Sequence, residues 1–385
     1  MHPILKFKKH DNIFLLLFLA LIIVGTIFLY SASSKINQFH TSRYDQNVYL
    51  VNHIIRILFG ILISLPFYCI NYKTLKNIGP WIGIVTIIAL LAARFINSGG
   101  HFTNTYRWLK IGPMNFQPSE FAKLSLILIL AAYFEDFQNN LNKFTRGFIP
   151  VIIAIGLFVG LILIGRDLGS AIAVTMVAGI VVISGGTKLK HWGSAVISII
   201  PLGVIAVIIE PYRIKRITSF ISNTPLNEMH EQIRHSLVSL GNGGLFGAGL
   251  GNSIGKNQYL PTSYADFIFS IVGEEIGFIG AFLILSLFLV FFLRGIQISM
   301  WTEDIFGTLV CTGLIFSIFM YVILNVCVTC RLLPVTGLPL PFFSYGGTAL
   351  MHNSIAVAII LNISSYKTNK TTIPETMVIN SYEEE

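Results

Sequence analysis

Apolar runs of about 20 residues recur along the whole chain and limit it to one class of fold. A helix needs roughly 20 apolar residues to cross the hydrocarbon core of a bilayer. Only 11% of the 385 residues are charged and 54% are hydrophobic, whereas about a quarter of the residues in a soluble domain are charged. We therefore predict an all-α polytopic membrane protein with about ten spans. The predicted spans are 13–31, 50–70, 77–96, 118–136, 147–165, 168–186, 192–210, 266–293, 305–328 and 343–363.

The first apolar run also resembles a secretory signal. Three lysines precede it and the small residues 31–33 follow it, as at a cleavage site. The run from Ile13 to Tyr30 is longer than the about 7–15 apolar residues of a signal-peptide core. We therefore expect an uncleaved first span that follows a cytoplasmic N-terminus at residues 1–12.

The basic residues of the short loops all fall on one side of this predicted topology. With the N-terminus in the cytoplasm, that side is the cytoplasmic one, as the positive-inside rule requires. The residues are Lys73, Lys76, Lys143, Arg146, Lys188, Lys190, Arg294, Lys367 and Lys370. The chain is then a single membrane domain, 1–385, with a cytoplasmic tail at 365–385 and a long extracytoplasmic loop, 211–264, between spans seven and eight.

The chain carries a formal net charge of +8. In a soluble protein this excess would suggest a nucleic-acid partner. Here the basic residues are scattered between apolar runs, so the positive-inside rule and an anionic substrate are the two explanations. We expect membrane lipids around the chain and no nucleic acid as a partner.

The four cysteines all fall in apolar segments. Cys327 and Cys330 form a CxxC pattern, which is also typical of zinc and redox sites. No second ligand pair lies near them in the sequence, so we interpret both as small buried hydrophobic residues.

The long loop is basic, which is unusual on the outer face. Between Arg213 and Lys256 it holds five Lys or Arg residues against two Glu, and this excess indicates an anionic ligand. Candidate ligand-binding residues are Arg213, Arg216, Arg234 and Lys256. The glycines between 241 and 251 allow close backbone approach, and turns rich in them can present N–H groups to a phosphate. A flexible lid or simple turns explain the glycines equally well.

Asp266 stands where this polar loop meets the apolar run that begins at Phe267. A carboxylate at such a boundary can accept a proton from a sugar hydroxyl or bind a divalent cation such as Mg²⁺ or Mn²⁺. The alternative is a helix N-cap. Glu274 and Glu275 lie two turns further into the span, where we expect them to form hydrogen bonds with neighbouring spans.

Two further segments are predicted on the same side of the membrane. In 97–117, Arg107 is free to face a pocket, and just beyond it Glu120 and Lys123 have the i,i+3 spacing of a local ion pair. The segment 334–347 is too rich in Pro and Gly to be a regular helix. Because irregular backbone at membrane depth is tolerated only against protein or a wet cavity, we expect it to form the re-entrant wall of a pocket.

Three motifs carry a resemblance to a known family. They are Arg107-Trp108 with FQPSE-x-AK (116–123), YLP-x(4)-DFIF-x(3)-GEE-x-G (259–277) and TGLPLPF-x-SYGG (336–347). In this order they make the chain resemble the SEDS family, the membrane proteins of bacterial shape, elongation, division and sporulation, over nearly its whole length. The division-type members are more similar to it than the elongation-type members.

The resemblance implies a ten-span bundle in the bacterial cytoplasmic (inner) membrane that polymerises lipid II as a peptidoglycan glycosyltransferase. The implied partners are a class B penicillin-binding protein and other divisome or elongasome membrane proteins. Asp266 is the family's essential aspartate. We expect Arg107, Lys123, Arg213, Arg216, Arg234, Ser236 and Lys256 to bind substrate, and Glu120, Asp167, Glu274, Pro339 and Ser344 to have structural or coupling roles.

The chain departs from the family pattern at three places. Ala265 stands where Thr is usual, Gly165-Arg166 stands where Gln-Pro is common before Asp-Leu-Gly, and Arg234-His235 is atypical beside Ser236. These departures concern the local details of the pocket.

The implied reaction converts an α-linked diphosphate donor into a β-1,4 bond, which is inversion by direct displacement. Asp266 would act as general base, and the basic residues or a divalent cation would stabilise the leaving diphosphate; in the alternative, Asp266 binds that cation. A lipid II flippase and a non-catalytic scaffold for the penicillin-binding protein are the rival functions. A flippase needs a polar path to both faces, whereas the polar cluster here is on the outer side, which favours an enzyme.

Overall fold

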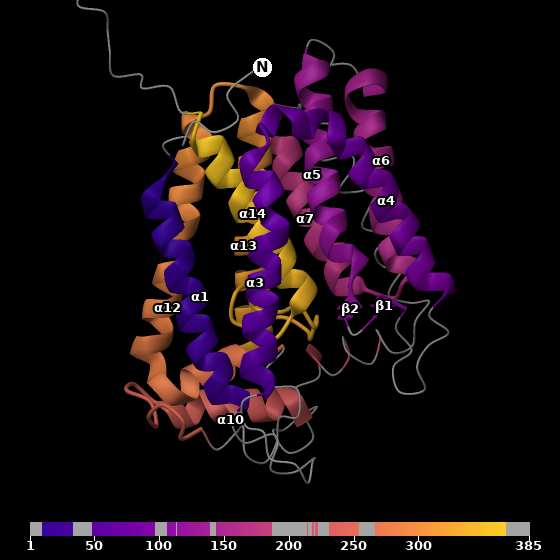
Figure 1. The fold of residues 1–385 in the computed structure, drawn as a ribbon. Helices are drawn as coiled ribbons and strands as arrows, with labels where there is room; N and C mark the ends of the chain where they lie inside the picture. The colour runs from indigo at the N-terminus through magenta and orange to yellow at the C-terminus, as the bar shows by residue number, and fades with distance from the viewer. Residues whose placement is uncertain are drawn as a thin grey trace, which may run out of the picture.

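The computed structural model describes residues 10–33, 48–96, 106–112, 114–138, 144–186, 214, 218, 220–221, 231–253 and 266–366. Within these residues the long helices run side by side (Figure 1). A short two-stranded hairpin lies between α4 and α5 along the chain. The elements are α1 (Asn12–Ser33), α3 (Val48–Cys69), η1 (Tyr72–Thr74), α4 (Leu75–Phe95), β1 (Leu109–Ile111), β2 (Met114–Phe116), α5 (Pro118–Asp136), η3 (Phe144–Phe148), α6 (Ile149–Ile164), α7 (Leu168–Ser184), α10 (Glu231–Gly243), α12 (Ile268–Trp301), α13 (Ile305–Thr329) and α14 (Gly347–Ser364). The two strands pair antiparallel, with Leu109 opposite Phe116.

The fold is that of an all-α polytopic membrane protein, as predicted. In the described part of the chain, seven helices are long and apolar enough to cross a membrane. They correspond to the predicted spans 13–31, 50–70, 77–96, 147–165, 266–293, 305–328 and 343–363. α7 is apolar but shorter, at 17 residues, and α5 carries four charged side chains. The predicted span 192–210 lies outside the described residues.

Two predicted boundaries are wrong. α14 begins at Gly347, because residues 343–346 still belong to the broken segment that precedes it. α12 continues to Trp301, beyond the expected end at 293. The helix can continue past Arg294 because the charge of this residue is paired there: its guanidinium donates to Asp11 Oδ2 at 2.7 Å.

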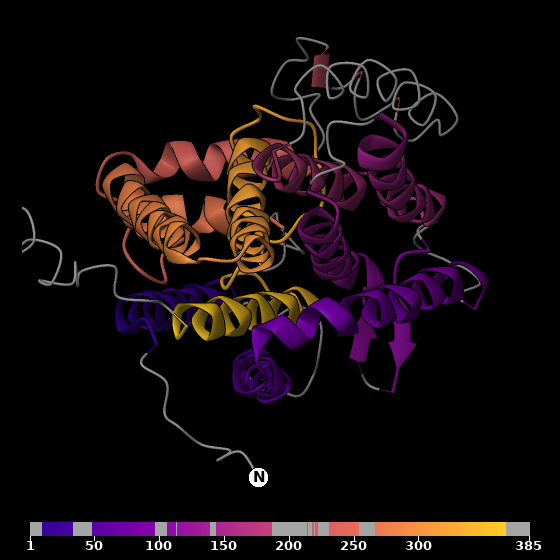
Figure 2. The same ribbon diagram turned by 90° about the horizontal axis from the view of Figure 1, so that it is seen from above.

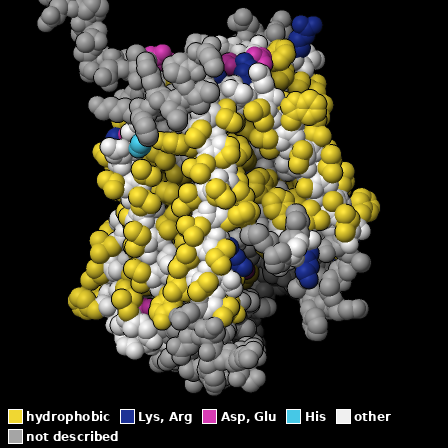
Figure 3. All heavy atoms as spheres, in the orientation of Figure 1, with side chains coloured by type: hydrophobic (Ala, Val, Ile, Leu, Met, Phe, Trp, Pro, Cys, Tyr) yellow, Lys and Arg dark blue, Asp and Glu magenta, His cyan; other side chains and the backbone are white. Residues whose placement is uncertain are grey.

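The buried core lies around α5, α7, α13 and α14. α14 packs between α3 and α13, as the view along the helices shows (Figure 2). Side chains on the outer helices, such as Leu16, Leu62 and Val85, remain more than half exposed. In Figure 3 such hydrophobic side chains cover the middle of the bundle, and charged side chains gather toward its two ends. This is the distribution expected of a surface that faces lipid.

The two ends of the bundle differ. α10 lies across one end beneath α12, and the β1–β2 hairpin is at the same end (Figure 1). We call it the site end. At the opposite end, the backbone N–H of Asp11 donates to Ser364 Oγ at 3.1 Å. This terminal end therefore holds the start of α1 and the end of α14.

α12 is kinked at Gly277, whose φ of 68° interrupts the helix. The backbone N–H groups of Phe278 and Ile279 donate to the carbonyls of Gly244 and Leu245, at 2.9 and 3.2 Å. In return, Ala248 and Gly249 donate to the carbonyls of Glu274 and Glu275, at 2.9 and 3.0 Å. Glycine is required at 277, because a β-carbon there would stand 2.4 Å from the amide nitrogen of Gly247. The segment after α10 thus satisfies the polar groups that the kink exposes.

Candidate functional site

Asp266 directly precedes α12 at the site end and is half-buried. The N-cap of α12 is Phe267, whose side chain makes no capping hydrogen bond. Asp266 therefore stands one residue before the assigned N-cap. The backbone carbonyl of Asp266 accepts a hydrogen bond from Asn325 Nδ2 at 2.8 Å, and the same amide donates to the carbonyl of Leu338 at 2.9 Å. One buried side chain of α13 thus joins the start of α12 to the Pro- and Gly-rich segment.

The carboxylate of Asp266 and the guanidinium of Arg107 meet at Gly337. A β-carbon at Gly337 would stand 3.5 Å from Asp266 Oδ2 and 3.8 Å from Arg107 Nη1. Gly337 has a φ of 70°, which non-glycine residues rarely adopt. The expectation that this segment forms a pocket wall agrees with this position. We call Asp266, Arg107, Asn325 and Gly337 the Asp266 cluster.

Arg107 also forms an ion pair with Asp167. Asp167 Oδ1 lies 4.0 Å from Arg107 Nη1, and the side chain of Asp167 is only 3% exposed. It caps α7 by accepting from the Ser170 N–H at 3.1 Å, and it also accepts from Gln117 Nε2 at 2.9 Å and from Ser119 Oγ at 3.2 Å. A carboxylate held by three donors is a fixed anchor, and Arg107 is positioned by it.

Glu120 and Lys123 form the predicted ion pair inside the bundle. Lys123 Nζ lies 2.7 Å from Glu120 Oε2, and each side chain is 1% exposed. Tyr321 donates to Glu120 Oε1 at 3.1 Å, and Lys123 Nζ stands 3.5 Å from the centroid of the Tyr321 ring. The ammonium group thus contacts both a carboxylate and an aromatic ring of the protein. This geometry groups Lys123 with the structural residues and gives no support to the substrate contact expected of it.

Two other predicted site residues, Ser236 and Glu274, form buried hydrogen bonds between α10 or the segment after it and the helices packed against them. Ser236 is fully buried and donates to the carbonyl of Thr329 at 3.0 Å. Glu274 is also fully buried and accepts a hydrogen bond from Ser253. The side chain of Ser236 is therefore turned into the protein and not toward a ligand.

Of the remaining predicted residues, Arg234 lies on α10, with Nη2 3.4 Å from His235 Nε2. Ser344 closes a turn by accepting from the Leu340 N–H at 2.8 Å, and Pro339 packs near Gly346. None of these contacts joins them to the Asp266 cluster. Arg213, Arg216 and Lys256 lie outside the described residues.

Asn325 and Gly337 were missed as site residues from the sequence. Asn325 offered a signal, because it is a polar side chain in the middle of an apolar span. Gly337 offered a weaker one, since glycines in a broken segment are common and only the structure shows which of them faces the carboxylate.

No cluster of three His, Cys, Asp or Glu side chains that could hold a metal occurs in the described part of the chain. Burial raises the pKa of the Cys330 thiol, and the neighbouring Cys327 raises it further. A raised pKa is that of an unreactive thiol, but Cys327 and Cys330 are only partly buried, so the prediction that both are buried is wrong.

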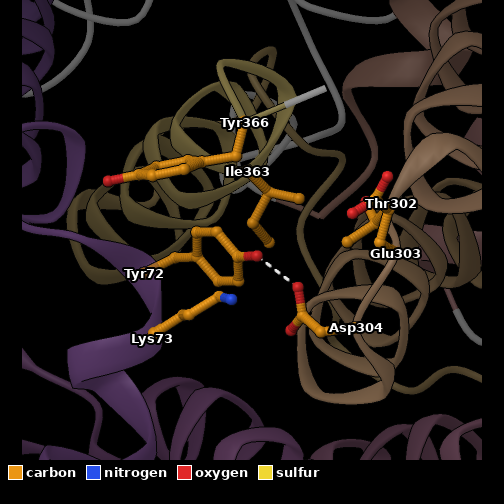
Figure 4. Close-up of a pocket in the computed structure, with 7 residues that line it drawn as sticks. All are labelled: Tyr72, Lys73, Thr302, Glu303, Asp304, Ile363 and Tyr366. Carbon is orange, nitrogen blue, oxygen red and sulfur yellow. Dashed lines mark hydrogen bonds between the residues drawn. The ribbon is translucent and has the colours of Figure 1, made fainter. Parts of the chain in front are cut away.

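A cavity of about 270 Å³ lies at the terminal end, where Tyr72 donates to Asp304 (Figure 4). It contains none of the predicted site residues. A crevice of only about 10 Å³, which we call the Arg107 crevice, adjoins the Asp266 cluster. It is lined by Leu90, Ala93, Tyr106, Arg107, Ser119, Leu161, Ile162, Gly165 and Asp167.

Solved structures with the same fold include the rod shape determining protein RodA of Thermus thermophilus. It is 22% identical to this chain, with a TM-score of 0.69 over 94% of this chain and 99% of that one. A chain from a peptidoglycan synthase complex that couples polymerization and crosslinking is 21% identical, with a TM-score of 0.73 and the same coverage.

Curated relatives are more similar in sequence. The stage V sporulation protein E of Bacillus subtilis is 36% identical over 372 residues, which are 94% of this chain and 98% of that protein. A probable peptidoglycan glycosyltransferase FtsW of Trichlorobacter lovleyi is 33% identical over 364 residues, 94% of each chain. The family described as "Cell cycle protein", which covers FtsW, RodA and SpoVE, matches residues 11–369. The chain therefore belongs to the FtsW/RodA/SpoVE family of cell cycle proteins.

Proposed function

We propose that the chain is an inverting peptidoglycan glycosyltransferase that polymerises lipid II into β-1,4 glycan strands. The observation that carries this proposal is the meeting of the Asp266 carboxylate and the Arg107 guanidinium at Gly337. A base and a cation near the same glycine provide for both ends of a displacement reaction: the proton of the nucleophile and the charge of the leaving group.

In the proposed reaction, the 4-hydroxyl oxygen of the acceptor sugar attacks the anomeric carbon of the donor. Its proton passes to Asp266 as the new C–O bond forms, and the bond from the anomeric carbon to the diphosphate breaks on the opposite face. Arg107 takes up the developing charge on the leaving diphosphate, together with Arg234 and the loop residues Arg213, Arg216 and Lys256. A divalent cation, when bound, would supply additional positive charge there.

The site end would face the outside of the cytoplasmic membrane, with both termini in the cytoplasm. Basic residues of the short loops support this orientation, because Lys73, Lys76, Arg146 and Arg294 are all at the terminal end. Lys76 pairs there with Glu135 at 2.6 Å, and Arg294 pairs with Asp11 at 2.7 Å. Lys and Arg in short loops are typical of the cytoplasmic side.

A class B penicillin-binding protein is the proposed partner, within the divisome or elongasome. The support is the shared fold with a chain of a peptidoglycan synthase complex. That complex is described as coordinating polymerization and crosslinking.

The flippase alternative requires an open polar path from end to end. Its candidate groups inside the bundle are Glu120, Lys123 and His352, which are 1%, 2% and 0% exposed. None of them lines the cavity at the terminal end or the Arg107 crevice, which favours the enzyme.

The test is polymerisation of purified lipid II, with and without a class B penicillin-binding protein and with Mg²⁺, Mn²⁺ or a chelator. We expect glycan ladders from the wild type and none from Asp266→Asn, provided that the variant keeps the wild-type melting temperature. Arg146→Gln, an exposed arginine at the terminal end, is the matched control and should give normal ladders. Ladders of normal yield from Asp266→Asn would refute the assigned role of this residue, and a wild type inactive in every condition would refute the proposed activity.

A further inference from the structure

Asn325 and Asn362 are buried amides near opposite ends of the bundle. Asn325 lies on α13 and Asn362 on α14, and each is 2% exposed. In both residues the side-chain Nδ2 donates to backbone carbonyls, and the side-chain Oδ1 has no hydrogen-bond partner among the described residues. A buried amide in an apolar helix is costly unless its hydrogen bonds offset the cost. The carbonyls that each amide holds therefore indicate its role.

Asn362 holds the end of one helix. Its Nδ2 donates to the carbonyls of Phe67 and Tyr68, at 2.8 Å each, and to that of Ile70. These carbonyls belong to the last turn of α3 or directly follow it. Because the last carbonyls of a helix have no partner within that helix, Asn362 acts as a cap that α14 supplies to α3. Its role is structural.

Asn325 instead joins two segments that are far apart along the chain. Its Nδ2 donates to the backbone carbonyl of Asp266 at 2.8 Å and to that of Leu338 at 2.9 Å. Leu338 directly follows Gly337, beside which the Asp266 carboxylate lies. One amide group therefore fixes the backbone of Asp266 relative to the pocket wall.

The helix that begins beside Asp266 does not hold this carbonyl itself. In a regular α-helix the Ser270 N–H would donate to the carbonyl four residues before it, which is that of Asp266. It donates instead to the carbonyl of Phe267, at 3.1 Å. The position of Asp266 is thus set from α13, through the Asn325 amide, and not by the hydrogen bonds of α12.

α13 provides a firm base for this amide. Tyr321 lies one helical turn before Asn325, so the two side chains share a face of the helix. The Tyr321 hydroxyl donates to Glu120 Oε1 inside the bundle, at 3.1 Å. Tyr321 also belongs to a small buried hydrophobic cluster with Leu324 and Leu338. Leu338 is therefore fixed to α13 by packing as well as by the amide.

We propose that Asn325 is a positioning residue, which holds Asp266 at the distance from the Gly337 segment that proton abstraction requires. Catalytic groups must be held within about 0.5 Å of their productive position, and a displacement of about 1 Å can lower a rate by about 10²-fold. Asn325 acts through the backbone of Asp266 and needs no contact with the substrate. The inference rests on the proposed function and adds to it how the base is held in place.

The first test compares Asn325→Leu with the matched control Asn362→Leu in lipid II polymerisation by the full-length chain. Both variants remove an amide of equal burial and leave its backbone carbonyls without that donor, so both should lower the melting temperature. For Asn325→Leu we expect kcat per folded protein to fall by about 10- to 100-fold, while KM changes by less than about twofold. Asn362→Leu should keep the kcat and KM of the wild type.

The second test does not depend on activity. In hydrogen–deuterium exchange, Asn325→Leu should accelerate exchange of the backbone amides in 266–272 and 336–340 together, by about tenfold or more. Asn362→Leu should accelerate it at the end of α3, in 66–71. A wild type that is inactive in polymerisation would refute the proposed function, and the exchange pattern would still decide whether Asn325 holds the two segments.

Asn325→Ser keeps one donor in a smaller side chain, and it replaces Asn325→Leu in both tests if the leucine variant does not fold. Its kcat should lie between those of the wild type and the leucine variant. A folded Asn325 variant with the kcat of the wild type would overturn the positioning role, as would an equal loss of kcat in Asn362→Leu. Unchanged exchange in 266–272 would overturn it as well, while polymerisation by the wild type would stand.

Discussion

The chain contains two ion pairs that differ in how they are held. Lys123 and Glu120 are 2.7 Å apart and both 1% exposed. Arg107 and Asp167 are 4.0 Å apart, with Arg107 28% exposed and Asp167 3% exposed. The first pair is therefore inaccessible to solvent. In the second pair the arginine is partly exposed, so a ligand phosphate can compete for the guanidinium while Asp167 keeps its three hydrogen-bond donors.

This difference shows how the bundle separates stability from binding. A buried pair that has lost one partner leaves an uncompensated charge, which is costly, whereas a long contact to a partly exposed arginine contributes little to stability. The following predictions test this contrast, in order of decreasing effect on stability.

Lys123→Met should destabilise the bundle most, by about 3–5 kcal/mol, because Glu120 is left buried without its partner. The measurement is thermal unfolding in detergent. Glu120→Leu/Lys123→Met should recover most of the loss, since both charges are then removed. A single variant as stable as the wild type would contradict the description of this pair as inaccessible to solvent.

Gly337→Ala should cost about 1–2 kcal/mol, because alanine is strained at a φ of 70°. The added methyl would also stand 3.5 Å from Asp266 Oδ2, in the space assigned to the substrate. We therefore expect lipid II polymerisation to fall by more than the loss of stability explains, when rates are corrected for folded protein. Gly346→Ala, in the same segment without a positive φ, is the control.

Ser236→Ala should cost about 1 kcal/mol, because the buried Thr329 carbonyl loses its donor. Its KM for lipid II should stay that of the wild type, since the hydroxyl faces the protein. A raised KM with unchanged melting temperature would restore Ser236 to the substrate-binding residues.

Arg107→Lys should change stability least, by less than about 1 kcal/mol, yet lower kcat/KM for lipid II clearly. Lysine keeps the charge but lacks the planar fork and the Nε donor of arginine. Equal activity in the lysine variant would show that only the charge at this position matters.

The spans could be predicted because each is encoded locally, by some 20 consecutive apolar residues. Asp266 could also be predicted, since a carboxylate at the border of an apolar run stands out, and the Glu120–Lys123 pair follows from helical spacing. These features need no knowledge of distant parts of the chain.

The rest depended on contacts between distant segments. The continuation of α12 past Arg294 depends on Asp11, 283 residues away. The site role of Asn325 depends on the backbone carbonyl of Asp266, 59 residues away. Arg94 and Arg166 both contact the ring of Tyr106, which is far from Arg166 along the chain. Such contacts cannot be predicted from the spacing of the residues along the chain.

The kink at Gly277 bears on how the protein can be engineered. A loop at a membrane surface is the usual place for an epitope tag or a fluorescent insertion. Residues 244–249 look like such a loop in the sequence, yet their backbone groups complete the hydrogen bonding of α12 at the kink. An insertion there would separate those groups from the helix that begins beside Asp266, so labels on this face should avoid the turn that follows α10.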